Sequence, residues 1–275
     1  MKRKWITRLL FLMGFVLCCL PTALNIIEQR HQSDAVATYQ AAAEKKKDKL
    51  SDELEKASAY NDMLYQSEGA VVDDMDTGIL SDRSYQELLD VSGTGIMGSL
   101  DIPKINVNLP IYHGTEDEVL SNGIGHIQGT SLPVGGKNTH SVLTGHRGLP
   151  SSKLLVRLDE LKEGDLFFIR VCDETLAYKV SEIQIVNPED VSKLQLYPEE
   201  DLVSLVTCTP YGINTQRLIV TGVRIAYREA EHEGIKEAVP SAREIFITAL
   251  PFLFLLAAAI LYIRNRRRID EDDKI

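Results

Sequence analysis

A cysteine and an arginine stand at neighbouring strand boundaries in the second half of the chain. The aliphatic run at 202–206 predicts a β-strand, and the Pro-Tyr-Gly turn at 210–212 ends it just after Cys208. Arg217 opens the next predicted strand, at 218–225. A turn between adjacent strands can bring both side chains to one site. There the cation favours the thiolate, the reactive form of cysteine, and the guanidinium can hold a carbonyl oxygen or an oxyanion.

His146 is the best candidate for the acid/base that a thiolate mechanism needs. It follows a short apolar strand predicted at 140–144 and precedes a glycine-rich turn, so its setting mirrors that of Cys208. Together with Arg217, these residues supply a nucleophile, a proton carrier and an oxyanion donor at three strand ends. The other interpretation of a cysteine, a small core hydrophobe, is the one we favour for Cys172, which ends another strand-like run.

Metal chemistry is a weaker interpretation of the histidines. His126, His140 and His146 have neither a cysteine pair nor an HExxH pattern beside them, and their spacing fits no zinc signature. The acidic stretch at 73–76 lacks the central glycine and the bidentate glutamate of an EF-hand loop. We therefore predict neither a metal site nor a cofactor.

Three short motifs resemble those of the sortases, the cysteine transpeptidases of Gram-positive cell surfaces. The family pattern Thr-Leu-x-Thr-Cys stands here as Ser-Leu-Val-Thr-Cys at 204–208, with Arg217 a short loop later. The family's Thr-Gly-His stands at 144–146. The resemblance covers roughly residues 99–227, and only Ser204 departs from the usual residue. It implies that Cys208 is the nucleophile, His146 the acid/base and Arg217 the carbonyl or oxyanion ligand, and that no cofactor is needed.

Short strands at regular spacing must position these residues. About eight of them over 98–228, with few helices, predict a β-barrel or sandwich, and the fold that the resemblance implies is an eight-stranded barrel. We expect helix from residue 28 to about 66 and again at 81–89 within a helical region at 28–97. In pilus-building class C sortases this region holds a lid with an Asp-Pro-aromatic motif, which is absent between Gln66 and Val91.

Two apolar segments predict membrane spans. Residues 9–27 and 245–263 carry no charge and are long enough to cross a bilayer. Basic clusters before the first and after the second place residues 1–8 and 264–275 in the cytoplasm. Everything between the spans is then extracellular, with a linker at 229–244. A cleaved signal peptide is the alternative for the first segment, although its end is a poor cleavage site.

Composition narrows the partners. The 275 residues are 44% hydrophobic and 25% charged, a globular balance. The net charge of −10 argues against nucleic acid, because phosphates need a basic face. The resemblance implies secreted pilin or surface proteins with Leu-Pro-x-Thr-Gly-like signals as substrates and a lysine amine of another pilin as acceptor. The alternatives are attachment to cell-wall peptide, a plain cysteine protease, and a scaffold that assembles pilins without catalysis.

Overall fold

The computed structural model describes residues 2–67, 83–147, 154–240 and 242–272. It divides into two compact units. Residues 29–238 form one unit, which holds all the strands. Residues 1–28 and 239–275 form the other, which is helical.

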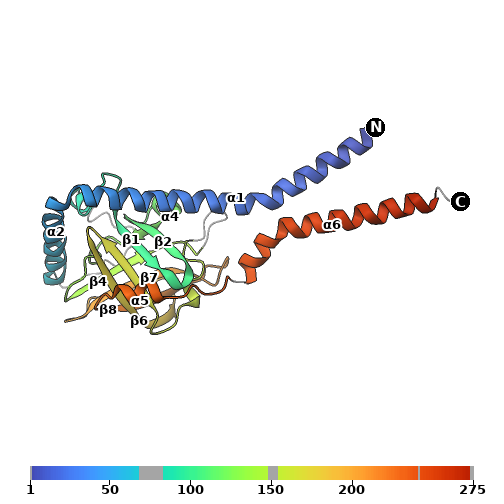
Figure 1. Cartoon of the computed structure of the whole chain (residues 1–275). Coiled ribbons are helices and arrows are strands. Elements are labelled where there is room, and N and C mark those ends of the chain that lie inside the picture. The colour runs from blue at the N-terminus through green and yellow to red at the C-terminus, as the bar shows by residue number, and fades with distance from the viewer. Residues whose placement is uncertain (1, 68–82, 148–153, 241, 273–275) are drawn as a thin grey trace. The chain divides into compact units, whose positions relative to one another are not determined.

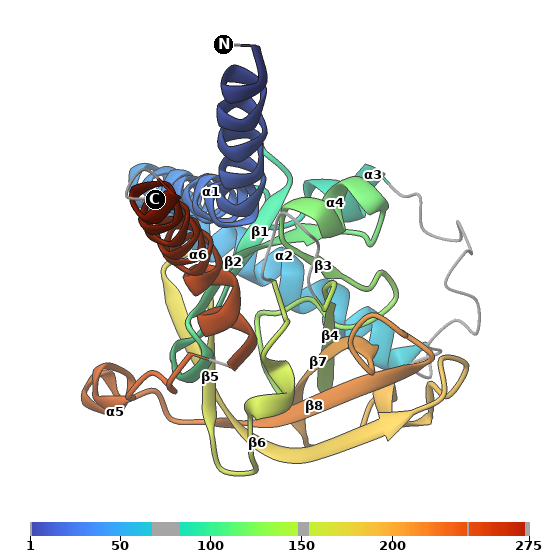
Figure 2. The ribbon, with the colours of Figure 1, turned by 90° about the vertical axis from the view of Figure 1, so that its right-hand side faces the viewer.

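Eight strands close into a barrel in the order β1-β2-β3-β4-β7-β8-β6-β5 (Figures 1 and 2). Two neighbouring pairs, β2 with β3 and β4 with β7, run parallel, and the other pairs are antiparallel. The predicted eight-stranded barrel is confirmed. Its strands are β1 (Ile96–Ile102), β2 (Val107–His113), β3 (Ile124–His126), β4 (Thr139–Thr144), β5 (Leu166–Val171), β6 (Glu174–Val186), β7 (Asp201–Thr209) and β8 (Gln216–Ile225).

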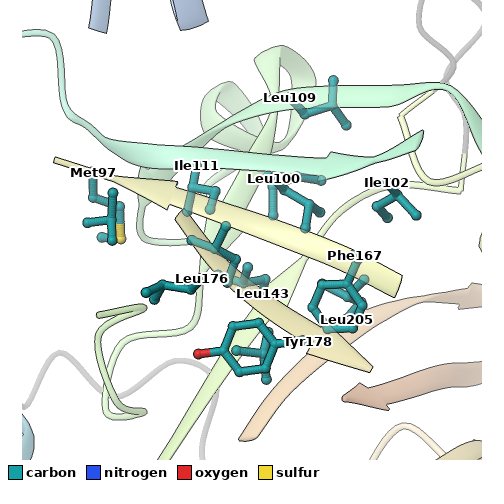
Figure 3. Packing of buried hydrophobic residues seen from close by; sticks show 14 of the residues in the cluster. Met97, Leu100, Ile102, Leu109, Ile111, Leu143, Phe167, Leu176, Tyr178 and Leu205 are labelled. Atoms are coloured by element: carbon teal, nitrogen blue, oxygen red, sulfur yellow. The ribbon is translucent and has the colours of Figure 1, made fainter. Parts of the chain in front are cut away.

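Alternation along each strand separates an inner face from an outer face. In β7, Val203 and Leu205 point into the barrel core, whereas the next residue, Val206, points outward. Figure 3 shows the core side chains, among them Leu143 of β4 and Phe167 of β5. Burial of each such side chain stabilises the fold by about 1.5–3 kcal/mol. A separate outer cluster consists of Val142, Leu194, Val206 and Ile219.

The N-terminal helices hold on to the barrel through a few buried polar groups. The helix predicted from residue 28 to about 66 is two helices, α1 (Lys2–Lys45) and α2 (Lys47–Gln66), which meet at a sharp turn (Figure 1). Tyr39 of α1 is 1% exposed, and its hydroxyl donates to the Met97 carbonyl (2.9 Å) while it accepts from the Cys172 amide (2.9 Å). Cys172 is buried at the β5–β6 turn, as expected of a core residue, and burial raises the pKa of its thiol to about 11.

Asn61 fixes α2 to the loop between β3 and β4. Its buried amide donates to the Leu132 carbonyl (3.1 Å) and accepts from the Leu132 amide (2.7 Å). One side chain thus satisfies both main-chain groups of a buried loop residue, which would otherwise be left unpaired.

Short helices complete this unit. The helix predicted at 81–89 is α3 (Arg83–Glu87), and its expected cap, Ser81, lies outside the described residues. The acidic stretch at 73–76 and most of the region where a lid would lie also fall outside them. The others are α4 (Asp117–Asn122), α5 (Glu229–Gly234) and the 3-10 helices η2 (Pro103–Ile105), η3 (Leu158–Glu160) and η4 (Ser192–Leu194).

The second unit contains two apolar helical stretches. Trp5–Lys45 within α1, which begins in this unit and continues past Glu28 into the barrel unit, and Ile245–Arg264 within α6 (Ala242–Asp272) are long and apolar enough to cross a membrane. Inside this unit the Phe254 ring lies 5.0 Å from the Phe11 ring, centroid to centroid. Gly14 leaves space for the Phe254 ring, because a Cβ there would stand only 3.1 Å from it. A glycine that lets another helix come close is a common device of membrane helices.

Candidate active site

The strand register of β7 and β8 brings Cys208 and Arg217 side by side. The two strands are antiparallel, and Cys208 is the direct partner of Arg217. Val206 and Ile219, each two residues further from the β7–β8 turn, are also partners and belong to the outer cluster. By the alternation of a strand, Cys208 and Arg217 therefore point to the same outer face. Both side chains are half-buried, and the cysteine is a free thiol.

His146 reaches the same place from the parallel neighbour on the other side of β7. The last register pair of β4 and β7 is Thr144 with Val206, and the Gly145 amide continues it with a 3.1 Å hydrogen bond to the Val206 carbonyl. The same register, carried two residues beyond the Thr144–Val206 pair, sets His146 level with Cys208. Because β4, β7 and β8 are consecutive around the barrel (Figure 2), the three predicted residues form one row across three strand ends.

Side-chain bonds flank this row on both sides. The Thr207 hydroxyl, one residue before Cys208, donates to the Gly145 carbonyl at 2.7 Å. One residue after Cys208, the Thr209 hydroxyl accepts from Arg147 Nη1 at 2.5 Å. The residues before and after the cysteine are therefore joined to the residues before and after the histidine.

Gly145 has little room around it. A Cβ at this position would stand 2.7 Å from Ile124 Cδ1 and 3.2 Å from Leu155 Cδ1. The Leu155 amide also donates to the His146 carbonyl at 3.1 Å. The glycine thus lets the histidine segment pass close to the barrel core, and the main chain of His146 is held from both ends. Gly148, which belongs to the predicted glycine-rich turn, lies outside the described residues.

Arg217 keeps donors available at the site. Within the described residues its guanidinium bonds through Nη1, to the main-chain carbonyls of Gln216 (3.2 Å) and Asn214 (3.5 Å). These carbonyls belong to the β7–β8 turn and the start of β8. A guanidinium carries five N–H donors, so the remaining nitrogens can bind a carbonyl oxygen or an oxyanion.

A buried polar chain lies on the same outer face, further from the cysteine. His140 Nδ1 donates to the Gln195 carbonyl (2.7 Å), so in the neutral ring Nε2 accepts from the Ser204 hydroxyl (2.8 Å). Ser204 in turn accepts from Thr221 (2.8 Å). Burial lowers the pKa of His140, which keeps its ring neutral. The chain fixes the loop between β6 and β7, where Gln195 lies, to the outer face.

The described residues offer no group of three or more His, Cys, Asp or Glu side chains that could hold a metal ion. His126 binds the Tyr85 hydroxyl through Nδ1 (2.8 Å) and the Ser131 carbonyl through Nε2 (2.9 Å). With His140 occupied as above, only His146 of the three histidines weighed as metal ligands lies beside the candidate nucleophile. The absence of a metal or cofactor in function stays a prediction.

Arg147, Thr209 and Asp159 were missed as parts of the site by sequence reasoning. Arg147 is 9% exposed and also forms an ion pair with Asp159 of η3. The only signal in the sequence is that Arg147 and Thr209 directly follow His146 and Cys208. That signal becomes readable only once the parallel register of β4 and β7 is known.

Comparison with known proteins shows which family the chain resembles. The sortase domain family model matches residues 100–225. Sortase D of Bacillus subtilis (strain 168) is 34% identical over 131 residues, which are 46% of this chain and 63% of that protein. The chain thus spans less than two thirds of this curated relative.

Solved structures extend the similarity over more of the chain. Sortase C-1 of Actinomyces oris is 42% identical with a TM-score of 0.60, covering 65% of this chain and 99% of that one. Sortase C1 of GBS pilus island 1 has a TM-score of 0.65 and covers 70% of this chain. Because the chain is 40% identical to this sortase C1 and covers 98% of its length, it belongs to the sortase family.

Proposed function

We propose that the chain is a membrane-anchored transpeptidase of the pilus-building kind, with Cys208 as nucleophile, His146 as acid/base and Arg217 as oxyanion ligand. It cleaves a Leu-Pro-x-Thr-Gly-like signal between Thr and Gly and joins the acyl group to a lysine amine of another pilin. The single observation that carries the proposal is the row of these three residues across the ends of β4, β7 and β8.

The outer face beside the row suits an extended peptide. From Cys208 back to Leu202, the six steps along β7 span roughly 20 Å at about 3.3 Å per residue. The outer cluster lies beneath this path, with its four side chains at most 8% exposed. At the far end lies an open pocket of about 370 Å³ lined by His140, Glu182 and Tyr197, among others. Because Cys208 is more exposed than Leu202, Ser204 or Val206, a short signal fits best at the cysteine end of β7, with its scissile bond at Cys208.

The chemistry needs only the three side chains. The Cys208 thiolate attacks the Thr carbonyl carbon, and Arg217 donates to the oxygen on which negative charge develops. The C–N bond then breaks, His146 gives its proton to the leaving glycine amine, and a thioester remains on Cys208. In the second half the acceptor amine attacks the thioester and loses a proton to His146. The C–S bond breaks, the thiolate returns and an amide forms, so the energy of the original amide is conserved.

Two features support pilus assembly as the purpose. One solved relative is a sortase C1 of GBS pilus island 1, and another solved relative, sortase C of Streptococcus pneumoniae, is described in terms of its pilin substrate specificity. The second apolar helix adds a C-terminal anchor. With basic clusters at 2–8 and 264–268, both ends lie in the cytoplasm and the barrel lies outside. Attachment of surface proteins to cell-wall peptide is the alternative acceptor chemistry.

Mass spectrometry of the intact chain in detergent tests the proposal. The protein is mixed with a Leu-Pro-x-Thr-Gly peptide and a lysine-bearing pilin fragment. We expect a thioester on Cys208 whose acyl group passes to the lysine. Cys208→Ala, His146→Ala and Arg217→Ala should abolish turnover, whereas Cys172→Ala, the matched cysteine control, should still form the adduct. Full activity of Cys208→Ala would refute the assignment.

The acceptor separates the remaining candidates. Transfer to a cell-wall peptide in preference to the pilin lysine would establish the anchoring alternative. A thioester that passes only to water, whatever amine is added, would establish a protease. Absence of an adduct, together with failure of a thiol-reactive probe to label Cys208, would favour the non-catalytic scaffold.

A further inference from the structure

We propose that Arg147 is a positioning residue that holds His146 and Cys208 at their working separation. The proposal rests on the proposed roles of those two residues. It adds a fourth residue, Arg147, to the three that the proposed mechanism uses.

The ladder between β4 and β7 ends before it reaches the two reacting residues. The last main-chain bond between these strands is from the Gly145 amide to the Val206 carbonyl. β4 ends at Thr144, whereas β7 continues to Thr209. The histidine therefore lies where main-chain pairing no longer fixes the distance between the strands.

Beyond the last main-chain bond, the Arg147 side chain joins the two segments. Its Nη1 donates to the Thr209 hydroxyl at 2.5 Å, and its Nη2 contacts Asp159 of η3. The guanidinium thus joins three segments: the residue after the histidine, the residue after the cysteine, and a 3-10 helix beside them. The planar fork is essential, because one group must point N–H donors in two fixed directions at once.

The Arg147 guanidinium is more deeply buried than the carboxylate that pairs with it, so its charge is only partly neutralised. The Arg147 side chain is 9% exposed, whereas its partner Asp159 is 50% exposed. Water screens the carboxylate more than the guanidinium, and within the described residues Arg147 Nε has no hydrogen-bond partner. Arg147 and Thr209 each follow a residue of the row by one position, so by strand alternation their bond lies on the opposite face from Cys208 and acts on the row through the main chain. Loss of Arg147 should therefore loosen the pairing of His146 with Cys208, and with it the support that the histidine gives the thiolate.

The chain offers a matched control in Arg157. This arginine is 7% exposed and pairs with Glu160, which lies on the same 3-10 helix as Asp159. Its third bond goes to the Ala238 carbonyl, away from the cysteine strand. Arg157→Gln therefore removes a buried arginine of similar packing without touching the bond to β7.

The test measures the rate of Cys208 alkylation by iodoacetamide from pH 5 to 10, followed by mass spectrometry on the whole chain in detergent. We expect Arg147→Gln to move the half-point upward, with about a tenfold lower rate near neutral pH, since one pH unit is a factor of ten in thiolate. Arg147→Lys should restore little, because it keeps the charge but loses the fork. Arg157→Gln should leave the profile where it is in the unmodified chain.

Thr209→Val keeps the proposal testable even if Arg147→Gln does not fold. It removes the same hydrogen bond from the other side in a side chain of similar shape, so it should shift the profile in the same direction. Combined with Arg147→Gln it should add little further. A profile for Thr209→Val or Arg147→Gln that matches that of Arg157→Gln would overturn the proposal.

The alkylation assay also separates this proposal from the proposed function. If the shift is present but no peptide forms a thioester, the positioning role stands and the proposed substrate is wrong. If His146→Ala leaves the alkylation profile of the unmodified chain unchanged, the histidine and cysteine do not act as a pair, and both proposals fall.

Discussion

Acid should destabilise the fold through His126, a histidine outside the catalytic row. His126 is 0% exposed, with Nε2 donating to the Ser131 carbonyl and Nδ1 accepting from Tyr85. A neutral ring satisfies both partners. Protonation would bury a charge and aim a second N–H at a hydroxyl that is already donating. Burial accordingly lowers the pKa of His126 from 6.5 to about 4.

The direction of the effect follows from linkage. Because the pKa is depressed in the folded state, the unfolded chain takes up a proton below pH 6.5 that the folded chain refuses until about pH 4. The stability that comes from keeping His126 neutral is therefore fully present above pH 6.5 and is lost as the pH falls. The loss is about 2 kcal/mol at pH 5 and reaches about 3 kcal/mol near pH 4.

Urea unfolding of the intact chain in detergent, followed by far-ultraviolet circular dichroism at pH 8 and pH 5, measures this loss. His126→Gln keeps a donor and an acceptor but cannot titrate. It should be less stable at pH 8, yet lose about 2 kcal/mol less than the unmodified chain between the two pH values. His31→Gln, at an exposed histidine of α1, is the matched control and should behave like the unmodified chain. Equal losses in the unmodified chain and in His126→Gln would refute the reasoning.

Two further substitutions test the attachments described above. Asn61→Ala removes both buried hydrogen bonds between the Asn61 side chain and the Leu132 main chain, and should lower the free energy of unfolding by roughly 2–4 kcal/mol. The control is Asn122→Ala, at an exposed helix position. It should change the free energy of unfolding by less than about 0.5 kcal/mol in the same urea titration. Gly145→Ala places a Cβ 2.7 Å from Ile124, so we expect the free energy of unfolding to fall by about 1–3 kcal/mol and thioester formation, followed by mass spectrometry, to slow. The control is Gly234→Ala, whose Cβ meets nothing within 4 Å, and it should change neither quantity. An Asn61→Ala or Gly145→Ala chain as stable as its control would contradict the packing.

The residues proposed for chemistry were within reach of sequence reasoning because each stands at a strand end. The strand before Cys208 is marked by aliphatic residues and a Pro-containing turn, and the start of the next by Arg217. Short-range signals of this kind locate strands and turns well. The number of strands and the barrel class followed from them and from the family resemblance, and the structure confirms both.

What the sequence could not reveal depends on contacts between distant segments. The neighbours β4 and β7 are joined in parallel although some 60 residues separate their partners, such as Thr144 and Val206. The bonds of Arg147 and Asn61 exist only in that arrangement. Local propensity also misled at Lys46, where a helix-favouring stretch breaks because tertiary contacts override it. There φ is −111° and ψ is 22°, and the lysine ammonium binds the Val91 carbonyl at 2.7 Å.

The departure at Ser204 from the family's usual threonine has a structural explanation. Ser204 is 0% exposed, and its hydroxyl links His140 to Thr221 at 2.8 Å on each side. Both serine and threonine supply the one donor and the acceptor lone pairs that this position uses. The requirement there is for a hydroxyl, because an unpaired His140 nitrogen would be buried next to the loop that it holds. The methyl group that serine lacks is secondary, so the change leaves the polar chain of the outer face, and the loop over it, intact.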